Sequence, residues 1–147
     1  MIRPIHAKDR PDWSSLWEGY QAFYEAELSR EQSELTWTRL LDPSVPLYGT
    51  VYEHDGKIVG FAHALVHLSS FSKNGQVYLE DLFVSPDFRG RSIGRALINA
   101  VIAFAHERKL SCVHWVTGSD NPARKLYDSV ADLRDYVQYR HVLELSE

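Results

Sequence analysis

The sequence predicts a single α+β domain, because helical and strand-like patterns alternate along a chain of ordinary domain length. Aromatic and apolar residues recur every three or four positions near the N-terminus, which is typical of an amphipathic helix. Alternating apolar residues flank Asp55-Gly56, a strong hairpin signal. Val77–Ala105 then reads as an apolar strand, a basic glycine-containing turn and an amphipathic helix. No repeat or linker interrupts the 147 residues, so we expect one domain over 1–147.

The N-terminal part is predicted to contain a short strand and two helices. Ile2–Ile5 fits the strand, and Asp9 opens a first helix whose aromatic and apolar positions continue to Leu28. Ser29–Leu41 fits a second helix, with Ser29 and Gln32 at the spacing of a capping box. The aromatic stripe of the first helix is wider than one face, so we expect most rings in the core and some lining a cleft.

The central part is predicted to be β structure. Two strands, Tyr48–Glu53 and Lys57–Leu68, flank the Asp55-Gly56 turn. A polar loop over Ser69–Gly75 is expected to lead into a third strand, Gln76–Val84. Simple alternation along that strand puts Glu80 on one side with Tyr78 and Leu82, and Asp81 on the other side with Leu79 and Phe83.

The C-terminal part predicts two further helices and two further strands. The helix over Ile93–Lys109 precedes a strand over Ser111–Thr117. Asp120-Asn121-Pro122 then starts a helix to about Ala131, with the proline where a missing N–H costs nothing. Tyr136–Leu145 is expected to close the chain as a β segment.

Composition excludes several classes of function. Sixteen basic against 20 acidic residues give a net charge of -4, which argues against a nucleic-acid binder with a broad positive surface. Neither a signal peptide nor a membrane-spanning segment is apparent, so we expect a cytoplasmic protein without a membrane partner.

Cys112 lies among apolar residues and is expected to be a core thiol rather than a nucleophile. His63 and His67 share a strand side, but no further ligand has metal-site spacing, so no metal is predicted.

The turn that follows the Gln76–Val84 strand is suited to an anion. Backbone N–H groups at a helix start lack intrahelical partners and lie at the positive end of the helix dipole. Arg89, Arg91 and Arg95 make this stretch basic within an acidic chain. The residues therefore predict a site for the phosphates of a nucleotide-like cofactor. An ATP- or NAD-binding module is the alternative, but no Gly-Lys-Ser/Thr follows the turn.

These segments resemble the GNAT superfamily of N-acetyltransferases, from Ile2 to Leu145. The family's turn has the form Arg/Gln-x-x-Gly-x-Gly/Ala, and this chain reads RGRSIG over 89–94, with Ser92 at the usual glycine position. YLEDLFVSPDFRG is similar to the polyamine acetyltransferases, and WSSLWEGYQAFYE followed by LDPSV is similar to the histone- and polyamine-acetylating branch. DNPARKLYDSV resembles the family's Asn-x-x-Ala-x-x-x-Tyr helix, although the usual Gly-Phe after it is absent.

The resemblance implies a mixed, mostly antiparallel sheet flanked by helices, with acetyl-CoA as cosubstrate. It implies direct transfer of the acetyl group, in a ternary complex, to a primary amine: polyamine-like, a lysine side chain or a small molecule. A homodimer is also implied, and a CoA-binding sensor or scaffold without catalysis is the alternative. Arg124 is expected either to reach the cosubstrate's phosphates or to be solvated. The expected cosubstrate contacts are Leu82, Phe83, Val84, Arg89, Gly90, Arg91, Ser92, Ile93, Gly94, Arg95, Asn121 and Arg124.

Two residues are expected to act on protons. Tyr127 matches the family's general acid, although a tyrosine packed on the sheet is the alternative. The ordinary pKa is about 10 for a phenol and 8.5 for a thiol, so proton transfer from Tyr127 to the CoA thiolate is uphill by roughly 2 kcal/mol. The position of the phenol must therefore favour the transfer. If Glu80 took a proton directly from an alkylammonium, the transfer would be uphill, because the ordinary pKa values of the two groups differ by about 6 units, or roughly 8 kcal/mol. Glu80 is expected to be an acceptor anchor or a relay through water, with a structural ion pair or a solvated strand end as the alternative.

The acceptor is expected to lie against aromatic rings and carboxylates. Trp17, Tyr20 and Tyr24 form the predicted wall, where cation–π attraction complements the charges of Glu80 and Asp81. A backbone N–H near Phe83 is the expected donor to the oxyanion, by resemblance to proteins that splay this strand from the next.

Overall fold

The structure is a computed structural model that describes residues 1–145. It divides into two compact units, Met1–Val116 and a second one that begins at Thr117. The elements of the first unit are β1 (Ile2–Pro4), the short 3₁₀ helix η1 (Ala7–Asp9), α1 (Arg10–Phe23), α2 (Arg30–Leu41), β2 (Leu47–His54), β3 (Lys57–Ser69), β4 (Ser72–Val84), η2 (Pro86–Phe88), α3 (Ile93–Glu107) and β5 (Val113–His114). The second unit contains α4 (Arg124–Val130).

The strands form one five-stranded sheet in the order β1-β2-β3-β4-β5. Neighbours from β1 to β4 are antiparallel, whereas β5 runs parallel to β4 and pairs with it only at Val77 and Tyr78. Asp55 and Gly56, with φ of 50° and 79°, make the tight turn between β2 and β3, as the sequence predicts. The expected α+β class and the mixed, mostly antiparallel sheet are confirmed.

The predicted polar loop at 69–75 is wrong over most of its length. β4 already begins at Ser72, which pairs with Ser69 of β3. A strand is defined by backbone pairing, and β3 supplies that pairing whether or not the side chains are apolar. Polarity therefore marked an exposed hairpin end rather than a loop.

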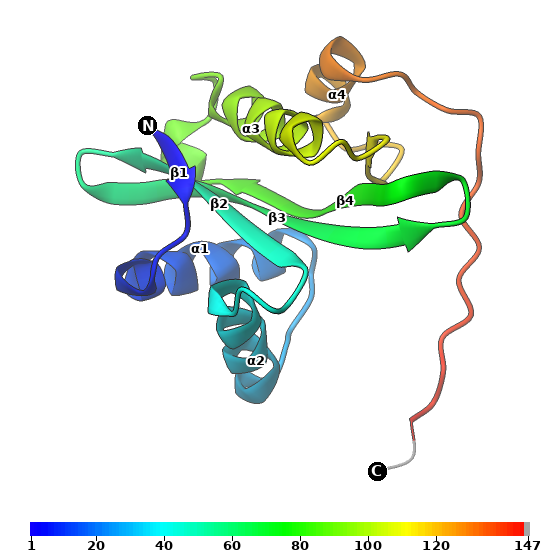
Figure 1. The fold of residues 1–147 in the computed structure, drawn as a ribbon. Helices are drawn as coiled ribbons and strands as arrows, with labels where there is room; N and C mark the ends of the chain where they lie inside the picture. Colours follow the sequence, from blue (N-terminus) through cyan, green and yellow to red (C-terminus); the bar gives the residue numbers. More distant parts are fainter. Residues whose placement is uncertain (146–147) are drawn as a thin grey trace. The chain divides into compact units, whose positions relative to one another are not determined.

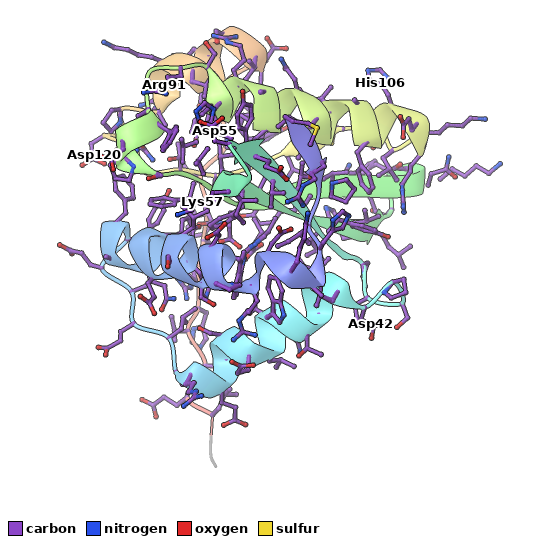
Figure 2. All side chains as sticks on the ribbon, turned by 90° about the vertical axis from the view of Figure 1, so that its left-hand side faces the viewer. Asp42, Asp55, Lys57, Arg91, His106 and Asp120 are labelled. Atoms are coloured by element: carbon purple, nitrogen blue, oxygen red, sulfur yellow. The ribbon has the colours of Figure 1, made fainter. Side chains whose placement is uncertain are left out.

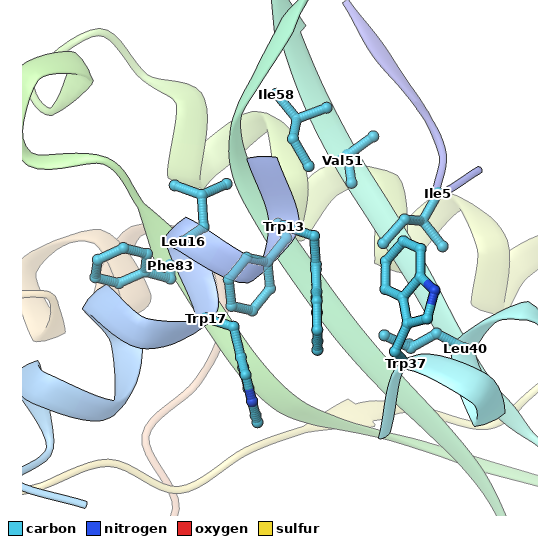
Figure 3. Close-up of a cluster of buried hydrophobic side chains, with 10 residues drawn as sticks. Ile5, Trp13, Leu16, Trp17, Trp37, Leu40, Val51, Ile58 and Phe83 are labelled. Carbon is cyan, nitrogen blue, oxygen red and sulfur yellow. The ribbon is translucent and has the colours of Figure 1, made fainter. Parts of the chain in front are cut away.

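Helices cover both faces of this sheet: α1 and α2 lie on one face and α3 on the other (Figure 1). Beneath α1 and α2, a cluster of buried side chains centres on three tryptophans, of which Trp13 is 0% exposed (Figure 3). The α3 face buries Leu97, Ile98 and Val101. The large aromatic area removed from water on one side makes the α1 face the main stabilising layer.

The helix boundaries follow local capping. The Oγ of Ser29 accepts the Gln32 N–H at 3.1 Å, which is one of the two hydrogen bonds of the predicted capping box. α1 ends at Phe23, so the predicted continuation to Leu28 is wrong. Glu25 has a φ of 51°, and a left-handed residue cannot continue a right-handed helix.

An ion-pair network fixes the N-terminal strand to the start of the helical layer. The guanidinium of Arg3 donates to both carboxylate oxygens of Asp9 at 2.8 Å and to Glu53 at 2.6 Å. Asp9 also accepts the His6 N–H at 2.8 Å, and its side chain is 5% exposed. The hydrogen bond from Arg3 holds the pKa of Asp9 below its usual range, against the effect of burial.

Three predictions for the last third of the chain are wrong. The strand expected over Ser111–Thr117 contains only Val113 and His114. Cys112 is exposed rather than core, because it lies beside a two-residue edge strand. Tyr136–Leu145 is not a strand: the structure gives this segment no strand pairing within the described residues, and without a paired neighbour an alternating pattern cannot form one.

The helix of the second unit begins slightly later than predicted, at Arg124 instead of Pro122. Asn121 accepts the Ala123 N–H through its side chain at 2.9 Å, which makes a turn before the helix. Over the residues that the structure describes, no helix has the length and apolar character needed to cross a membrane.

Replacing Asp9 with Asn tests the N-terminal network. We expect Asp9→Asn to lower the free energy of unfolding by about 2 kcal/mol at neutral pH, the order of hydrogen bonds to a charged group. Because the folded pKa of Asp9 is lowered, its stabilisation is present above about pH 4 and is lost as pH falls through the folded pKa. Urea unfolding between pH 2 and 7 should thus show the variant and the native protein converging in acid.

The control is Glu34→Gln, which removes an exposed ion pair with Arg10. This change should leave stability unaltered within error, because exposed pairs contribute little. Equal losses for the two variants would contradict the special role of Asp9.

Candidate active site

The turn between β4 and α3 leaves backbone amides directed outward. Gly90 and Ser92 have φ of 76° and 62°, and the hydrogen-bond ladder of α3 begins with Ala96 N–H donating to Ser92 at 3.0 Å. The Ser92 hydroxyl makes no capping bond. In the described part of the chain, the amides of Ile93 and Gly94 therefore have no helical acceptor, and they can bind an anion.

The arginines of this turn do not all point away from the protein. Arg89 donates from Nε to the Val84 carbonyl at 3.1 Å, and its guanidinium lies 5.4 Å from the Phe83 ring and 5.8 Å from the Phe23 ring. Arg89 thus ties the turn to β4 and to the end of α1. Arg91 lies 5.0 Å from the Phe88 ring, and both Arg91 and Arg95 are exposed.

A hollow of about 470 Å³ borders the turn, between α1 and the β2–β3 hairpin. Figure 2 labels Asp55, Lys57 and Arg91, which contribute to its lining. The lining combines both signs of charge, with Asp12 and Asp55 beside Lys57 and Arg91.

Beyond Tyr78, the edge of β4 that faces β5 is open. The parallel pairing stops there, while Ser85 N–H still donates to Val59 of β3 at 2.8 Å. Because backbone groups alternate along a strand, Phe83 also faces β3, and the backbone groups of Leu82 and Val84 face the open side. The candidate oxyanion or cosubstrate donors along this edge are therefore Leu82 and Val84, the two neighbours of the predicted Phe83.

A bulge in β4 lies at the two acidic residues. The register shifts between the pairs His63–Asp81 and Ala64–Leu79, which leaves Glu80 as the extra residue. Since His63 and Ala64 face opposite sides of β3, Asp81 and Leu79 also face opposite sides. The alternation predicted for these two was wrong, because the sequence gives no sign of the bulge.

Asp81 lies on the α1 face, where His63 holds it. Its Oδ2 is 2.9 Å from Nδ1 of His63. Burial is the main cause of the raised pKa of Tyr20, and the nearby negative charge of Asp81 raises it further, so the phenol stays protonated.

Glu80 is exposed beside Asp81. Desolvation, followed by the charge of Asp81, raises its pKa. A raised pKa makes a carboxylate a better proton acceptor than an ordinary glutamate. Tyr78, next to it on β4, also has a raised pKa, mainly through desolvation.

The predicted aromatic wall is contiguous. The rings of Trp17 and Tyr20 stack at 5.4 Å, and those of Tyr20 and Tyr24 are 4.9 Å apart. Trp17 is buried, whereas Tyr24 is 47% exposed and Tyr20 is intermediate. The part of the wall that a ligand can touch therefore consists of Tyr20 and Tyr24, with Trp17 supporting them from the core.

The second unit holds the remaining predicted residues and is described by itself. Tyr127 lies in the middle of α4, where its N–H donates to Ala123 at 3.1 Å. The Asn121 amide donates to Thr117 Oγ1 at 2.9 Å, and Arg124 donates to the Ser119 carbonyl at 2.6 Å. Within their unit, Asn121 and Arg124 stabilise the start of α4.

Sequence reasoning missed the partners of Asp81. His63 was considered only as a metal ligand, and Trp13 only as one of the rings of the first helix, most of which were expected in the core. The one feature of the sequence that points to this arrangement is a histidine inside an apolar strand, and it does not indicate which residues would be its partners. His67 instead pairs with His114, their Nε2 atoms 2.8 Å apart. The described residues contain no group of three or more metal-ligating side chains.

The sequence matches the model of the acetyltransferase (GNAT) family over residues 13–131. The chain is 36% identical to the D-amino-acid N-acetyltransferase HPA3 of Saccharomyces cerevisiae over 143 residues, which cover 95% of this chain and 89% of that protein. It is 40% identical over 125 residues to an uncharacterized N-acetyltransferase of Methanocaldococcus jannaschii. That match covers 82% of this chain and 54% of the relative, so the chain spans about half of that protein.

Solved structures show the same fold at low sequence identity. An aminoglycoside acetyltransferase from an uncultured soil metagenomic sample, in complex with trehalose, has a TM-score of 0.80 at 23% identity, with 98% of this chain and 96% of that one covered. AAC(6')-Iy in complex with the bisubstrate analog CoA-S-monomethyl-acetylneamine has a TM-score of 0.81 at 20% identity, with coverage of 97% and 98%.

The two left-handed residues of the turn give opposite stability predictions. Ser92→Gly should raise the free energy of unfolding by about 0.5–1 kcal/mol, because the left-handed cost for serine exceeds the unfolded-state entropy that glycine adds. Gly90→Ala should lower it by about 1 kcal/mol, although no atom lies within 4 Å of the added Cβ. Thermal unfolding of both variants should show melting temperatures shifted in opposite directions; shifts of the same sign would contradict the assigned backbone conformation.

Proposed function

The chain belongs to the acetyltransferase (GNAT) family, and from this premise we propose that it transfers an acetyl group to a primary amine by direct attack in a ternary complex. It is an acetyl-CoA-dependent N-acetyltransferase, and acetyl-CoA is its cosubstrate. The thioester supplies the activated acetyl group. We further propose that residues 1–147 form one catalytic domain, which is supported by a family match that extends on both sides of Val116.

The turn from Arg89 to Arg95 is proposed to hold the diphosphate of the cosubstrate. Outward amides at Ile93 and Gly94 and exposed cations at Arg91 and Arg95 fit a doubly charged group. Ser92 adds a hydroxyl donor where a glycine is usual in the family. The open edge formed by Leu82 and Val84 can then hydrogen-bond the amide-containing arm that follows the diphosphate. Asn121 and Arg124 are proposed as further contacts, on the motif that carries Tyr127.

One observation carries the choice of a cationic acceptor. Glu80 and Asp81, which are adjacent carboxylates, lie next to the accessible rings of Tyr20 and Tyr24. Carboxylates attract an ammonium group directly, and aromatic faces attract it through their quadrupoles. Polyamine-like amines and lysine side chains, the acceptors of the histone- and polyamine-acetylating branch, suit this environment. Small-molecule amines fit the same argument.

A D-amino acid is a second candidate acceptor. The relative HPA3 carries that substrate in its name. A zwitterion needs a cation for its carboxylate as well as an anion for its amine, and Arg89 lies against Phe83 of the same strand. The acceptor panel below therefore includes both classes.

Proton transfer is proposed to use two groups. Glu80 accepts the proton of the ammonium, directly or through water, and its raised pKa reduces the difference between its pKa and that of the ammonium. The phenol of Tyr127 is proposed to protonate the departing thiolate. Since a phenol is a weaker acid than a thiol, this role depends on the position of the phenol and on a hydrogen bond that strengthens as negative charge develops on the sulfur.

We also propose that the protein acts in the cytoplasm as a homodimer. Apolar side chains near the end of the chain are exposed, and a second copy is the proposed partner that covers them. These side chains are Leu133, Tyr136, Val137, Tyr139, Val142, Leu143 and Leu145.

The activity is tested by incubation with acetyl-CoA and single acceptors while free thiol is measured. The panel contains spermidine, a lysine peptide, D- and L-amino acids and an aminoglycoside. We expect thiol release with at least one primary amine, and none with Gly94→Asp, whose carboxylate blocks and repels the diphosphate. Cosubstrate binding by calorimetry without thiol release on any amine would instead favour a CoA-binding sensor.

Tyr127→Phe tests the proposed acid. We expect kcat to fall 10²- to 10⁴-fold, the usual contribution of a positioned acid, while calorimetric affinity for acetyl-CoA stays within about twofold. The control is Tyr139→Phe, which removes a hydroxyl from an exposed tyrosine outside α4. An unchanged kcat for Tyr127→Phe would remove Tyr127 from the mechanism.

A further inference from the structure

His63 is a titratable residue with no access to solvent. It lies in the middle of β3 and is 0% exposed. Its ring stacks on Phe61 at 4.5 Å and lies 5.4 Å from Trp17 and 6.1 Å from Trp13. A charged imidazole in such an aromatic enclosure would be strongly disfavoured unless it were paired.

Both ring nitrogens of His63 have partners, and these determine its proton. The indole Nε1–H of Trp13 lies 3.1 Å from Nε2 of His63. An indole N–H can only donate, so Nε2 must be the acceptor and carries no proton. The proton is therefore on Nδ1, which donates to Oδ2 of Asp81 at 2.9 Å.

Among the described residues, His63 is the printed ion-pair partner of Asp81, so a neutral His63 leaves the negative charge of Asp81 uncompensated there. An imidazolium would point a second N–H at the indole N–H of Trp13, so the geometry excludes the charged form. The groups that face His63 from α1 and β3 are uncharged rings, and the charges that act on it come from Asp81 and, through space, from Glu80. Tyr20, on which the charge of Asp81 also acts, has a raised pKa and is neutral.

On the basis of the proposed amine acceptor, we propose that Trp13 and His63 are positioning residues that keep Asp81 oriented and fully charged as the anchor for the acceptor's ammonium group. Trp13 fixes the tautomer of His63, and His63 fixes the carboxylate. An ion pair in place of this hydrogen bond would orient Asp81 equally well but would cancel the charge that the acceptor needs.

Trp13→Phe breaks the arrangement at its far end. Without the indole donor, His63 can take the Nε2–H tautomer, which turns a lone pair toward Asp81, or a second proton, which neutralises the pair. We expect the KM for the amine to rise about tenfold, the effect of one lost hydrogen bond to a charged group, with KM for acetyl-CoA changed less than twofold.

Trp37→Phe is the matched control. Trp37 is 7% exposed, its ring centroid is 4.9 Å from that of Trp13, and it belongs to the same buried cluster (Figure 3). Both variants should lose stability, but only Trp13→Phe should raise the KM for the amine. Equal amine KM values in the two variants would overturn the positioning role.

Substitution of His63 itself separates the two hydrogen bonds. An asparagine amide can occupy the position of Nδ1 and donate to Asp81, whereas a glutamine amide reaches toward Trp13 and leaves Asp81 without that donor. We expect His63→Asn to keep the amine KM within about threefold and His63→Gln to raise it about tenfold. A purely structural role predicts no difference between them.

Nitrogen-15 NMR of the His63 ring provides a readout that does not depend on activity. We expect an uncharged Nδ1–H ring at neutral pH in the native protein, and a different tautomer or charge in Trp13→Phe. A native Nε2–H or imidazolium ring would overturn the inference. An Nδ1–H ring in a protein that acetylates no amine would instead overturn the proposed function, and the anchoring role with it.

Discussion

The antiparallel ladder between β3 and β4 determines where every part of the first unit's site lies. Its register brings His63 opposite Asp81, and its bulge at Glu80 interrupts the regular alternation at the two acidic neighbours. Because β5 pairs with β4 only at Val77 and Tyr78, the same strand also has a free edge toward the basic turn. One strand thus contributes the acceptor carboxylates and the cosubstrate edge, with the backbone fixed by β3 on the opposite side.

The aromatic layer beneath the sheet stabilises the fold and also controls polar chemistry. Trp13 and Trp17 bury large rings against β3, but their indole N–H groups also donate to His63 and Ser33. A buried donor requires an acceptor, so the packing of Trp13 restricts the protonation of His63. Packing and electrostatics are therefore coupled on this face, and a conservative change in the core can alter the orientation and charge of the Asp81 carboxylate.

The basic turn carries its own conformational cost. Ser92 occupies a left-handed backbone conformation at the start of α3, where glycine would be relaxed. The fixed ends of the turn explain why this conformation persists: Arg89 is hydrogen-bonded to Val84, and Ile93, the first residue of α3, is buried. Between these anchors, the chain directs amides outward instead of forming a side-chain cap. The strained residue thus coincides with the proposed diphosphate site, as is common for binding loops.

Local patterns in the sequence determined most of the helices and strands of the first unit, the Asp55-Gly56 hairpin, the cap at Ser29 and the basic turn before α3. These features depend on residues within a few positions of one another. Tertiary structure alone decided the bulge at Glu80, the exposure of Cys112, the absence of strand pairing at 136–145 and the partners of His63. Each of these depends on pairing or packing between segments far apart in the chain: Trp13, His63 and Asp81 come from a helix and two strands, and no local spacing encodes their hydrogen bonds.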